Sequence, residues 1–437
     1  MDPHRAIGGD LLVFWFFYGI IQITYKKGVF MIVEKRIKDF EKLGFGMFVH
    51  FGLYSVIGKG EWAKHILNIP WCEYLKTLDS FAPKINWAEE LVLIAKEAGC
   101  RYITLTTRHH DGFSLYDTCG LNTYDAPNVC GRDIVKEFVD ACNKYGIIPF
   151  FYHTLLDWHE ESYKNNFKEY LKYLRKSIEI LCKNYGKIGG FWFDGMWDKP
   201  NEDWEEDALY SLIRSFQPDT MIINNTGLNN RGELGHIELD SVTFERGRPH
   251  PINHECSPKY VASEMCETFA SHWGYAKNDF NFKPLEHLIN SFAICRRYRS
   301  NFLFNVGPKA DGSLRTIDKG ALEILGQWSN LNDEALHIPE PTDIEIKDKP
   351  NNFILRNDNT YYLFMNDLSI NGNENITINN NFNCDNIFPF NKKVKSVCWL
   401  DSGEALNFTQ NDSEININSK PFEYGQDFVV RIAKIEV

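Results

Sequence analysis

Hydrophobic and polar residues follow two alternating spacings along most of this chain. Between residues 45 and 336, stretches with an apolar residue at every third or fourth position, typical of amphipathic helices, alternate with short apolar runs, typical of buried strands. Residues 86–98, for example, have the helical spacing and end before Gly99, and the apolar run 102–107 follows directly. The pattern therefore predicts a regular succession of helices and strands.

This succession repeats often enough to predict a particular fold. Helices are predicted at residues 86–98, 134–145, 163–185, 205–216 and 285–298. Strands are predicted at residues 45–51, 102–107, 147–152, 188–193, 221–224, 241–244, 267–269 and 302–306. Such alternation over this length is typical of an α/β protein with a TIM-like (β/α)8 barrel. An open doubly wound sheet is the competing fold, but no Gly-x-Gly-x-x-Gly motif follows the first predicted strand.

The pattern changes after about residue 341. Helical spacing gives way to short alternating runs separated by Asn, Asp and Gly, which predict a small antiparallel β-sandwich. The runs lie at residues 353–356, 361–365, 376–378, 394–400 and 428–437. We therefore expect a catalytic barrel over residues 31–340 and a C-terminal β-sandwich over residues 341–437.

The N-terminal segment does not fit this scheme. Residues 11–25 are strongly apolar but shorter than the roughly 20 residues that a membrane-spanning helix needs. No small-residue cleavage site precedes Lys26 and Lys27. We expect residues 1–30 to be an extension that is unstructured or mis-started, with an uncleaved signal anchor as the alternative.

Composition narrows the class of protein and of partner. The 437 residues carry a net charge of −12, which argues against a nucleic-acid partner because that affinity comes largely from Lys and Arg. The 11 cysteines form no Cys-x-x-Cys pair, so neither a zinc knuckle nor a disulfide framework is indicated. A cytoplasmic protein without a stable membrane partner is the simplest interpretation, and the sequence is compatible with a homo-oligomer.

Polar residues stand where several predicted strands end. His109 and His110 follow the run 102–107, and His50 occupies the corresponding place in the first strand. A single histidine there is more often a hydrogen-bonded structural group than a ligand. In a barrel, however, strand ends converge at the face that carries the active site, so their joint occurrence favours a binding pocket.

A carboxylate stands at another strand end. Asp194 lies between Phe193 and Gly195 in an apolar setting, where a carboxylate without a partner would be costly, so it needs a partner or a task. The alternative is a structural Asp that caps the following turn. Trp192, two residues earlier, shares its face of the strand and is a candidate wall of the same pocket.

Two chemistries fit histidines and carboxylates at strand ends. A metal-dependent hydrolase would use the histidines as ligands, but adjacent residues such as His109 and His110 point to opposite faces of a continuing strand. Hydrogen bonding to a polyhydroxylated ligand needs less strict geometry and fits better. Glycoside hydrolysis would require a second carboxyl group beside Asp194.

Several short motifs occur in a specific order along the chain. They are VHFG at 49–52, Glu61-Trp62, RHHDGF at 108–113, Tyr152 with Asp157-Trp158, WFDG at 192–195, HWGY at 272–275 and NFLFNVGP at 301–308. Together they resemble the α-L-fucosidases of glycoside hydrolase family 29, and the resemblance extends from about residue 45 to residue 337.

The resemblance implies a retaining exo-α-L-fucosidase that releases terminal α-L-fucosyl residues from glycoconjugates or oligosaccharides through a covalent fucosyl-enzyme. Asp194 would be the nucleophile, and no metal or organic cofactor is implied. Substrate-binding roles pass to His50, Glu61, Trp62, His109, His110, Tyr152, Trp192 and Arg231. Trp273 would contact the C6 methyl group of fucose, with Phe48 a weaker candidate.

The acid/base residue is less well defined by the motifs. Glu245 follows a short predicted strand and is the preferred candidate, with Glu233, Glu238 and Glu264 as rivals. Two functional alternatives stay open. One is a metal-dependent hydrolase on the same barrel, and the other is a sugar-binding protein that has lost turnover.

Overall fold

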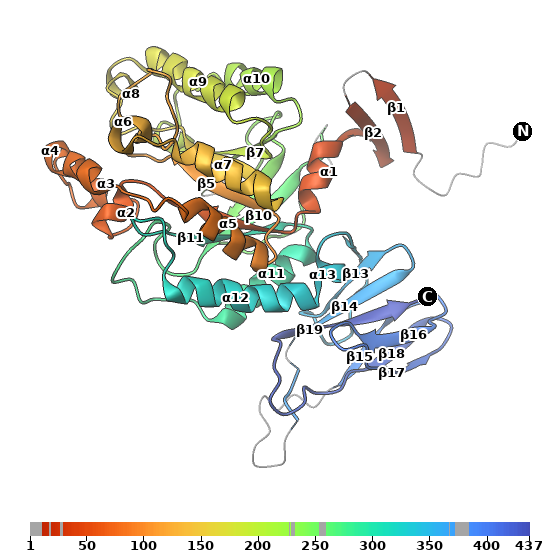
Figure 1. Ribbon diagram of the computed structural model, residues 1–437. Coiled ribbons are helices and arrows are strands. Elements are labelled where there is room, and N and C mark those ends of the chain that lie inside the picture. The colour runs from red at the N-terminus through yellow and green to blue at the C-terminus, as the bar shows by residue number, and fades with distance from the viewer. Residues whose placement is uncertain are drawn as a thin grey trace, which may run out of the picture. The chain divides into compact units, whose positions relative to one another are not determined.

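A computed structural model describes residues 11–16, 19–26, 29–226, 228, 232–252, 259–366, 368–371 and 384–437 (Figure 1). The chain divides into two compact units. One comprises Met1–Phe282 and Asn301–Gly320, and the other comprises Lys283–Ser300 and Ala321–Val437. The division of the chain at residue 341 stays a prediction.

Eight parallel strands of the first unit form a closed barrel, which confirms the predicted fold class. The strands are β4 (Phe45–Val49), β5 (Tyr102–Arg108), β6 (Ile148–Thr154), β7 (Gly190–Asp194), β8 (Met221–Asn224), β9 (Ser241–Glu245), β10 (Ala262–Thr268) and β11 (Asn301–Val306). They neighbour one another in chain order, and β11 pairs with β4 to close the barrel. The carboxyl ends of all eight strands therefore meet at one rim of the barrel.

Helices connect the strands, and Figure 1 shows α5, α7, α9 and α10 outside the barrel. The helices of the barrel segment are α1 (Lys35–Glu41), α2 (Tyr54–Ile57), α3 (Ala63–Ile66), α4 (Trp71–Tyr74), α5 (Trp87–Glu97), α6 (Ala126–Cys130), α7 (Ile134–Tyr145), α8 (Ser162–Asn165), α9 (Phe167–Asn184) and α10 (Glu206–Phe216), with the 3-10 turns η1 (Leu75–Ser80) and η2 (Met196–Asp198). The predicted helix 163–185 is divided at Asn166, whose side chain accepts a hydrogen bond from the Glu169 N–H and caps α9.

Strand β10 is longer than predicted. The sequence indicated only residues 267–269, whereas the strand begins at Ala262. Glu264 interrupts the apolar run, yet its side chain is buried and accepts hydrogen bonds from Tyr102 and Trp192. The local hydrophobic pattern missed the start of this strand, because the hydrogen-bond partners of Glu264 are distant in the sequence.

Large rings fill the barrel, which is possible because small residues face them. Tyr102, Phe150, Tyr152 and Trp192 belong to one buried cluster. A Cβ atom on Gly46 would collide with the Tyr102 ring, so glycine is required at that position of β4. This ring layer forms the floor beneath the carboxyl ends of the strands.

A buried ion cluster fixes the start of β9. Asp240 directly precedes the strand and is fully buried. Its carboxylate is 2.9 Å from Arg36 Nη2, 2.6 Å from Arg214 Nη2 and 2.7 Å from Lys259 Nζ. Burial opposes its ionisation, but these positive charges lower the pKa of Asp240 to about 2. The cluster sets the position of the strand that ends at Glu245.

The second unit contains two antiparallel sheets. One has the order β12 (Glu340–Pro341), β13 (Phe353–Asn357), β14 (Thr360–Asn366), β19 (Val430–Glu436), β16 (Ser396–Trp399), and the other β15 (Asp385–Pro389), β18 (Glu414–Asn418), β17 (Asn407–Gln410). Leu363 and Trp399 of the first sheet and Ile417 of the second share one core. Its helices include α11 (Leu285–Arg297) and α13 (Asp333–Leu336), and α12 (Thr316–Leu331) runs from one unit into the other.

The C-terminal prediction is confirmed in its class and in four strands. Runs 353–356, 361–365, 394–400 and 428–437 correspond to β13, β14, β16 and β19, and run 376–378 lies outside the described residues. Strands β15, β17 and β18 were not predicted, because Asn-rich sequence resembles loop.

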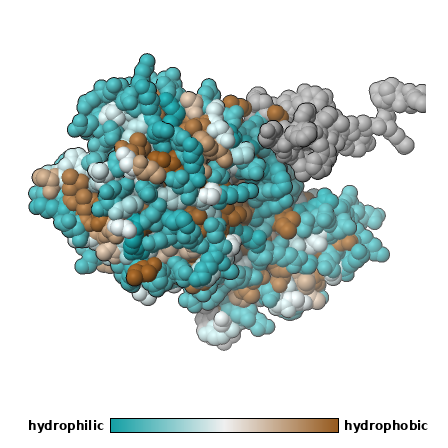
Figure 2. Space-filling view, turned by 45° about the horizontal axis from the view of Figure 1, so that its top comes forward, coloured by the Kyte–Doolittle hydropathy of each residue, from teal (hydrophilic) through white to brown (hydrophobic). Residues whose placement is uncertain are grey.

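Before the barrel, β1 (Leu11–Phe16), β2 (Gly19–Lys26) and β3 (Val29–Glu34) pair as an antiparallel sheet. The described part of residues 1–30 thus contains strands where the sequence predicted none, and the mis-started origin of this segment stays a prediction. Among the described residues, no helix has both the length and the apolarity to cross a bilayer. Figure 2 shows apolar residues in small groups on a largely hydrophilic face.

We expect Asp240→Asn to lower the free energy of unfolding by about 3–5 kcal/mol, because three cations would lose their buried counter-charge. Since the folded pKa of Asp240 is depressed, its stabilisation should be full above about pH 4 and lost as the pH falls toward 2. Denaturant titrations over this range test both effects. The exposed Asp219→Asn is the control, and an unchanged unfolding curve for Asp240→Asn would contradict the assignment.

Candidate active site

A cavity of about 200 Å³ opens at the carboxyl ends of the barrel strands. Its lining residues are Phe48, His50, Trp62, His109, His110, Tyr152, Trp192, Asp194, Trp197, Leu228, Glu245 and Trp273. The structure thus brings together the predicted site residues, with two exceptions. Glu61 does not line the cavity, and Arg231 lies outside the described residues.

The three histidines share one wall of the cavity. His50 follows β4, and His109 and His110 follow β5, which ends at Arg108. Because the strand has ended, the side chains of His109 and His110 need not point to opposite faces. The ring centroids are 5.7 Å apart for His50 and His109, and 4.1 Å for His109 and His110. Side chains that are about 60 positions apart in the sequence therefore form one polar surface.

Hydrogen bonds fix two of these rings. His50 Nδ1 lies 2.6 Å from Asn305 Oδ1, and His110 Nδ1 lies 2.7 Å from Thr154 Oγ1. Within the described ranges, His109 Nδ1 is buried without a hydrogen-bond partner. A polar ligand would satisfy such an atom.

Burial keeps the histidines neutral at physiological pH. It lowers the pKa of His50 to about 3 and that of His110 to about 4, although the nearby Asp194 carboxylate partly opposes the shift for His110. Burial also lowers the pKa of His109 well below its usual value. Neutral imidazoles offer one donor and one acceptor each, which suits sugar hydroxyl groups.

Asp194 ends β7 and receives hydrogen bonds on both carboxylate oxygens. Tyr152 Oη donates to Oδ2 at 3.1 Å, and Trp197 Nε1 donates to Oδ1 at 3.1 Å. Asn225 Nδ2 contacts Oδ1 at 3.3 Å, and His110 Nε2 lies 3.6 Å from Oδ2. The carboxylate thus has partners, as its apolar sequence setting required.

Glu245 ends β9 and lines the same cavity as Asp194. Its Oε2 accepts a hydrogen bond of 2.7 Å from the same Asn225 Nδ2 that contacts Asp194. The two carboxylate oxygens therefore lie no further apart than the sum of these distances to one nitrogen. This geometry places two carboxyl groups side by side at one site.

The rival glutamates do not line the cavity. Glu264 lies inside the barrel, where its carboxylate accepts hydrogen bonds from Tyr102 Oη and from Trp192 Nε1 at 2.9 Å. Glu238 lies 3.9 Å from Arg214, and Glu233 is exposed. Among these candidates, only Glu245 has its carboxylate beside Asp194.

Aromatic rings next to His50 form a further part of the lining. Phe48 packs against Trp192 and Trp273, with ring centroids 5.1 Å and 5.9 Å away. Buried Glu61 holds this part of the lining in place, since its Oε2 accepts hydrogen bonds from the backbone N–H groups of Trp273 at 3.1 Å and Gly274 at 2.8 Å. The direct contact of Glu61 with a ligand stays a prediction.

Sequence reasoning missed three residues of the site, Asn225, Trp197 and Leu228. Asn225 stands directly after β8, so the rule that found the histidines at strand ends could have found it. Trp197 lies in η2, three residues after Asp194, and no periodic signal marks it.

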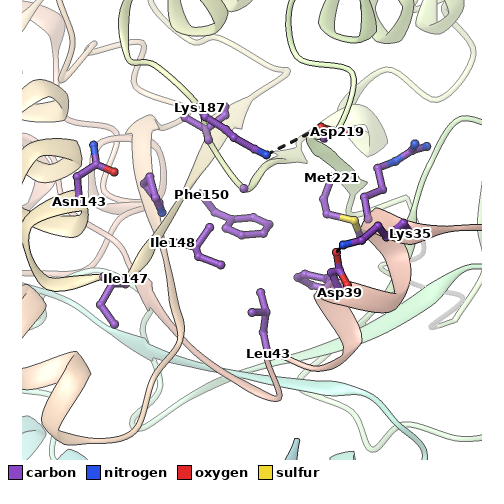
Figure 3. Close-up of a pocket in the computed structure, with 16 residues that line it drawn as sticks. Lys35, Asp39, Leu43, Asn143, Ile147, Ile148, Phe150, Lys187, Asp219 and Met221 are labelled. Carbon is purple, nitrogen blue, oxygen red and sulfur yellow. Dashed lines mark hydrogen bonds and ion pairs between the residues drawn. The ribbon is translucent and has the colours of Figure 1, made fainter. Parts of the chain in front are cut away.

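A larger cavity of about 780 Å³ lies at the opposite end of the barrel (Figure 3). Ile148 and Phe150 at the start of β6 and Met221 at the start of β8 line it, with the ion pair Lys187–Asp219 at its edge. Barrel enzymes carry their chemistry at the carboxyl ends of the strands, so the smaller cavity is the candidate active site. In the described part of the chain, no three His, Cys, Asp or Glu side chains are grouped as metal ligands.

We expect the buried histidines to make stability depend on pH. Because the folded pKa of His110 is lowered, its contribution is present above about pH 6.5 and lost as the pH falls toward 4. His110→Asn should flatten the decline in unfolding free energy by up to about 1.4 kcal/mol per pH unit. Denaturant unfolding at several pH values measures this, with the exposed His250→Asn as control. Parallel pH curves for His110→Asn and the unmodified protein would refute a neutral, buried His110.

Comparisons with known proteins give a consistent result. Residues 23–334 match the family described as Alpha-L-fucosidase. The chain is 26% identical over 333 residues to tissue alpha-L-fucosidase of Homo sapiens, covering 69% of each protein. It is 25% identical over 338 residues to the tissue alpha-L-fucosidase of Rattus norvegicus, covering 69% of this chain and 70% of that protein.

Solved structures show the same architecture. Alpha-L-fucosidase isoenzyme 1 from Paenibacillus thiaminolyticus matches with a TM-score of 0.79 and 26% identity, over 92% of this chain and 98% of that one. A GH29 alpha-L-fucosidase from Bacteroides thetaiotaomicron, solved as a trapped covalent intermediate with 2-fluoro-fucosyl fluoride, shares the fold with a TM-score of 0.76 and 23% identity, over 92% and 96% of the two chains.

Proposed function

Since this chain belongs to the alpha-L-fucosidase family of glycoside hydrolases, we propose that it releases terminal α-L-fucosyl residues with retention of configuration. In this mechanism Asp194 is the nucleophile and Glu245 is the acid/base. The substrate is a fucosylated glycan or glycoside. Cytoplasmic location and homo-oligomerisation stay predictions.

The observation that carries the proposal is the pairing of the two carboxylates. Asn225 Nδ2 lies 3.3 Å from Asp194 Oδ1 and 2.7 Å from Glu245 Oε2, which limits the separation of these oxygens. Retaining glycosidases keep their carboxyl groups about 5–5.5 Å apart, whereas inverting enzymes need roughly 6.5–9.5 Å to admit a water molecule. The upper limit set by the shared nitrogen favours the retaining class.

The two steps follow from this arrangement. Asp194 attacks the anomeric carbon while Glu245 protonates the leaving oxygen, and a covalent fucosyl-enzyme forms. Glu245 then takes a proton from water, which attacks the same carbon and releases Asp194. The trapped intermediate of the Bacteroides thetaiotaomicron fucosidase supports this course by analogy of fold.

The cavity supports recognition of a single terminal sugar. Its volume of about 200 Å³ lies below the roughly 300–1,000 Å³ typical of larger ligand sites, which suits one monosaccharide ring. The neutral histidines, Tyr152 and Trp62 would bind hydroxyl groups. Phe48 and Trp273 would contact the C6 methyl group, which a hydroxymethyl group could not replace without loss.

We expect the protein to prefer 4-nitrophenyl α-L-fucoside to the α-L-galactoside, which differs only by a hydroxyl group on C6. The rings of Phe48 and Trp273 favour contact with a methyl group over a hydroxymethyl group, so kcat/KM should fall by about 100-fold. Equal values would contradict the methyl-binding role of these rings. Loss of fucoside hydrolysis after chelator treatment would favour the metal-dependent alternative.

We expect Asp194→Gly to lose hydrolysis by several orders of magnitude, because the attacking group is absent. Azide should restore turnover by entering the vacated space and should yield fucosyl azide of inverted configuration, detectable by NMR. Asp198→Asn, at an exposed carboxylate four residues along, is the control. Undiminished hydrolysis by Asp194→Gly would remove Asp194 from its role, and a wild-type protein that binds fucose without turnover would indicate the sugar-binding alternative.

A further inference from the structure

Asn225 occupies a position between three barrel strands. It directly follows β8 and is 2% exposed. Its backbone N–H donates to the Phe193 carbonyl at 2.9 Å, next to Asp194 on β7. Its side chain contacts Thr243 and Glu245 on β9 and also Asp194 on β7. The residue therefore links the strand of the nucleophile to the strand of the acid/base.

A threonine fixes the orientation of the Asn225 amide. Thr243 Oγ1 donates to Asn225 Oδ1 at 2.9 Å, and Thr243 is buried. Thr243 stands two residues before Glu245, so both side chains share one face of β9. With its oxygen held by Thr243, the amide turns its nitrogen toward the carboxylates. The flipped amide would place an oxygen against two acceptors, which is unfavourable.

We propose that Asn225 is a positioning residue whose amide donates to whichever carboxylate is ionised in each half-reaction. This inference rests on the proposed function. In the first step Asp194 is charged and Glu245 holds the proton. When the bond from Asp194 to the anomeric carbon forms and the leaving oxygen takes the proton, the negative charge passes to Glu245. An amide nitrogen has two N–H donors, so it serves both states without moving.

The same contact also orients the acid. Because the amide N–H already donates to Glu245 Oε2, a proton on that oxygen is disfavoured and is directed to Oε1. Donation to a carboxylate favours its ionised form. Removal of the amide should therefore make Glu245 retain its proton to higher pH. A purely structural role for Asn225 would not produce this shift.

The other titratable and charged residues near Glu245 are the same in the wild-type protein and in the variants. In the part of the chain that the structure describes, these groups come from several elements. Tyr152 on β6 and Cys266 on β10 interact electrostatically with both Glu245 and Asp194. Arg246 follows Glu245 directly in the sequence. A shift caused by changing Asn225 or Thr243 alone thus reports the amide.

The test compares kcat/KM against pH for Asn225→Ala, Thr243→Val and Thr243→Ser on 4-nitrophenyl α-L-fucoside. Asn225→Ala should lower kcat about 10- to 100-fold, the effect of a hydrogen bond to a charged group. In the plot of kcat/KM against pH for Asn225→Ala, the alkaline limb should move to higher pH. Thr243→Val should shift the limb in the same direction by less, and Thr243→Ser, which keeps the hydroxyl, should recover most of the loss.

Asn224→Ala is the matched control. Asn224 is also a buried asparagine at the end of β8, but its Nδ2 donates to Tyr210 Oη at 3.0 Å and not to a carboxylate. It should lower the melting temperature without moving the pH profile. If Asn225→Ala does not fold, the two Thr243 variants carry the test.

The outcomes separate this inference from the proposed function. Absence of fucoside hydrolysis by the wild-type protein would overturn the function itself. Normal wild-type hydrolysis, with the alkaline limbs of Asn225→Ala and Thr243→Val unchanged, would overturn the role of Asn225 alone. Displaced limbs in both variants, with Asn224→Ala unmoved, would support it.

Discussion

Hydrogen-bond donors from several parts of the chain converge on the carboxylate of Asp194 at the rim of the barrel. Tyr152, Trp197 and Asn225 supply hydrogen bonds from three separate parts of the chain. These parts meet because the eight parallel strands close into a barrel and end at one rim. Closure of the barrel is therefore what allows protein groups to provide the hydrogen bonds of this one carboxylate.

The cavity lining has two kinds of surface, one formed by histidines and one formed by aromatic rings. Burial lowers the pKa values of His50 and His110, so the wall that they form is polar but neutral at physiological pH. Phe48 and Trp273 add aromatic rings to the lining, next to His50, and the Arg246 guanidinium lies over the Trp273 ring. At the other end of β9, Asp240 and its cations fix the strand that carries Glu245. A buried structural ion cluster thus stands at one end of the strand and Glu245, the proposed acid/base, at the other.

The strands and several site residues could be predicted because their signals are local. An apolar run that ends in a polar residue identified His50, His109 and Asp194, and the structure brings all three to one cavity. The signal failed where a polar residue is satisfied by distant partners, as for Glu264 in β10. The contact of Glu61 with the Trp273 backbone joins residues more than two hundred positions apart, which no local pattern reveals.

In the proposed mechanism, Asp194 forms a covalent bond with the anomeric carbon of fucose. The most direct measurement is peptide mass spectrometry after incubation with a 2-fluoro-fucosyl fluoride, whose fluorine at C2 slows breakdown of the intermediate. The account predicts a single fucosyl adduct on the peptide that contains Asp194. An adduct on Glu245 or another residue, or its absence in a protein that hydrolyses fucosides, would contradict it.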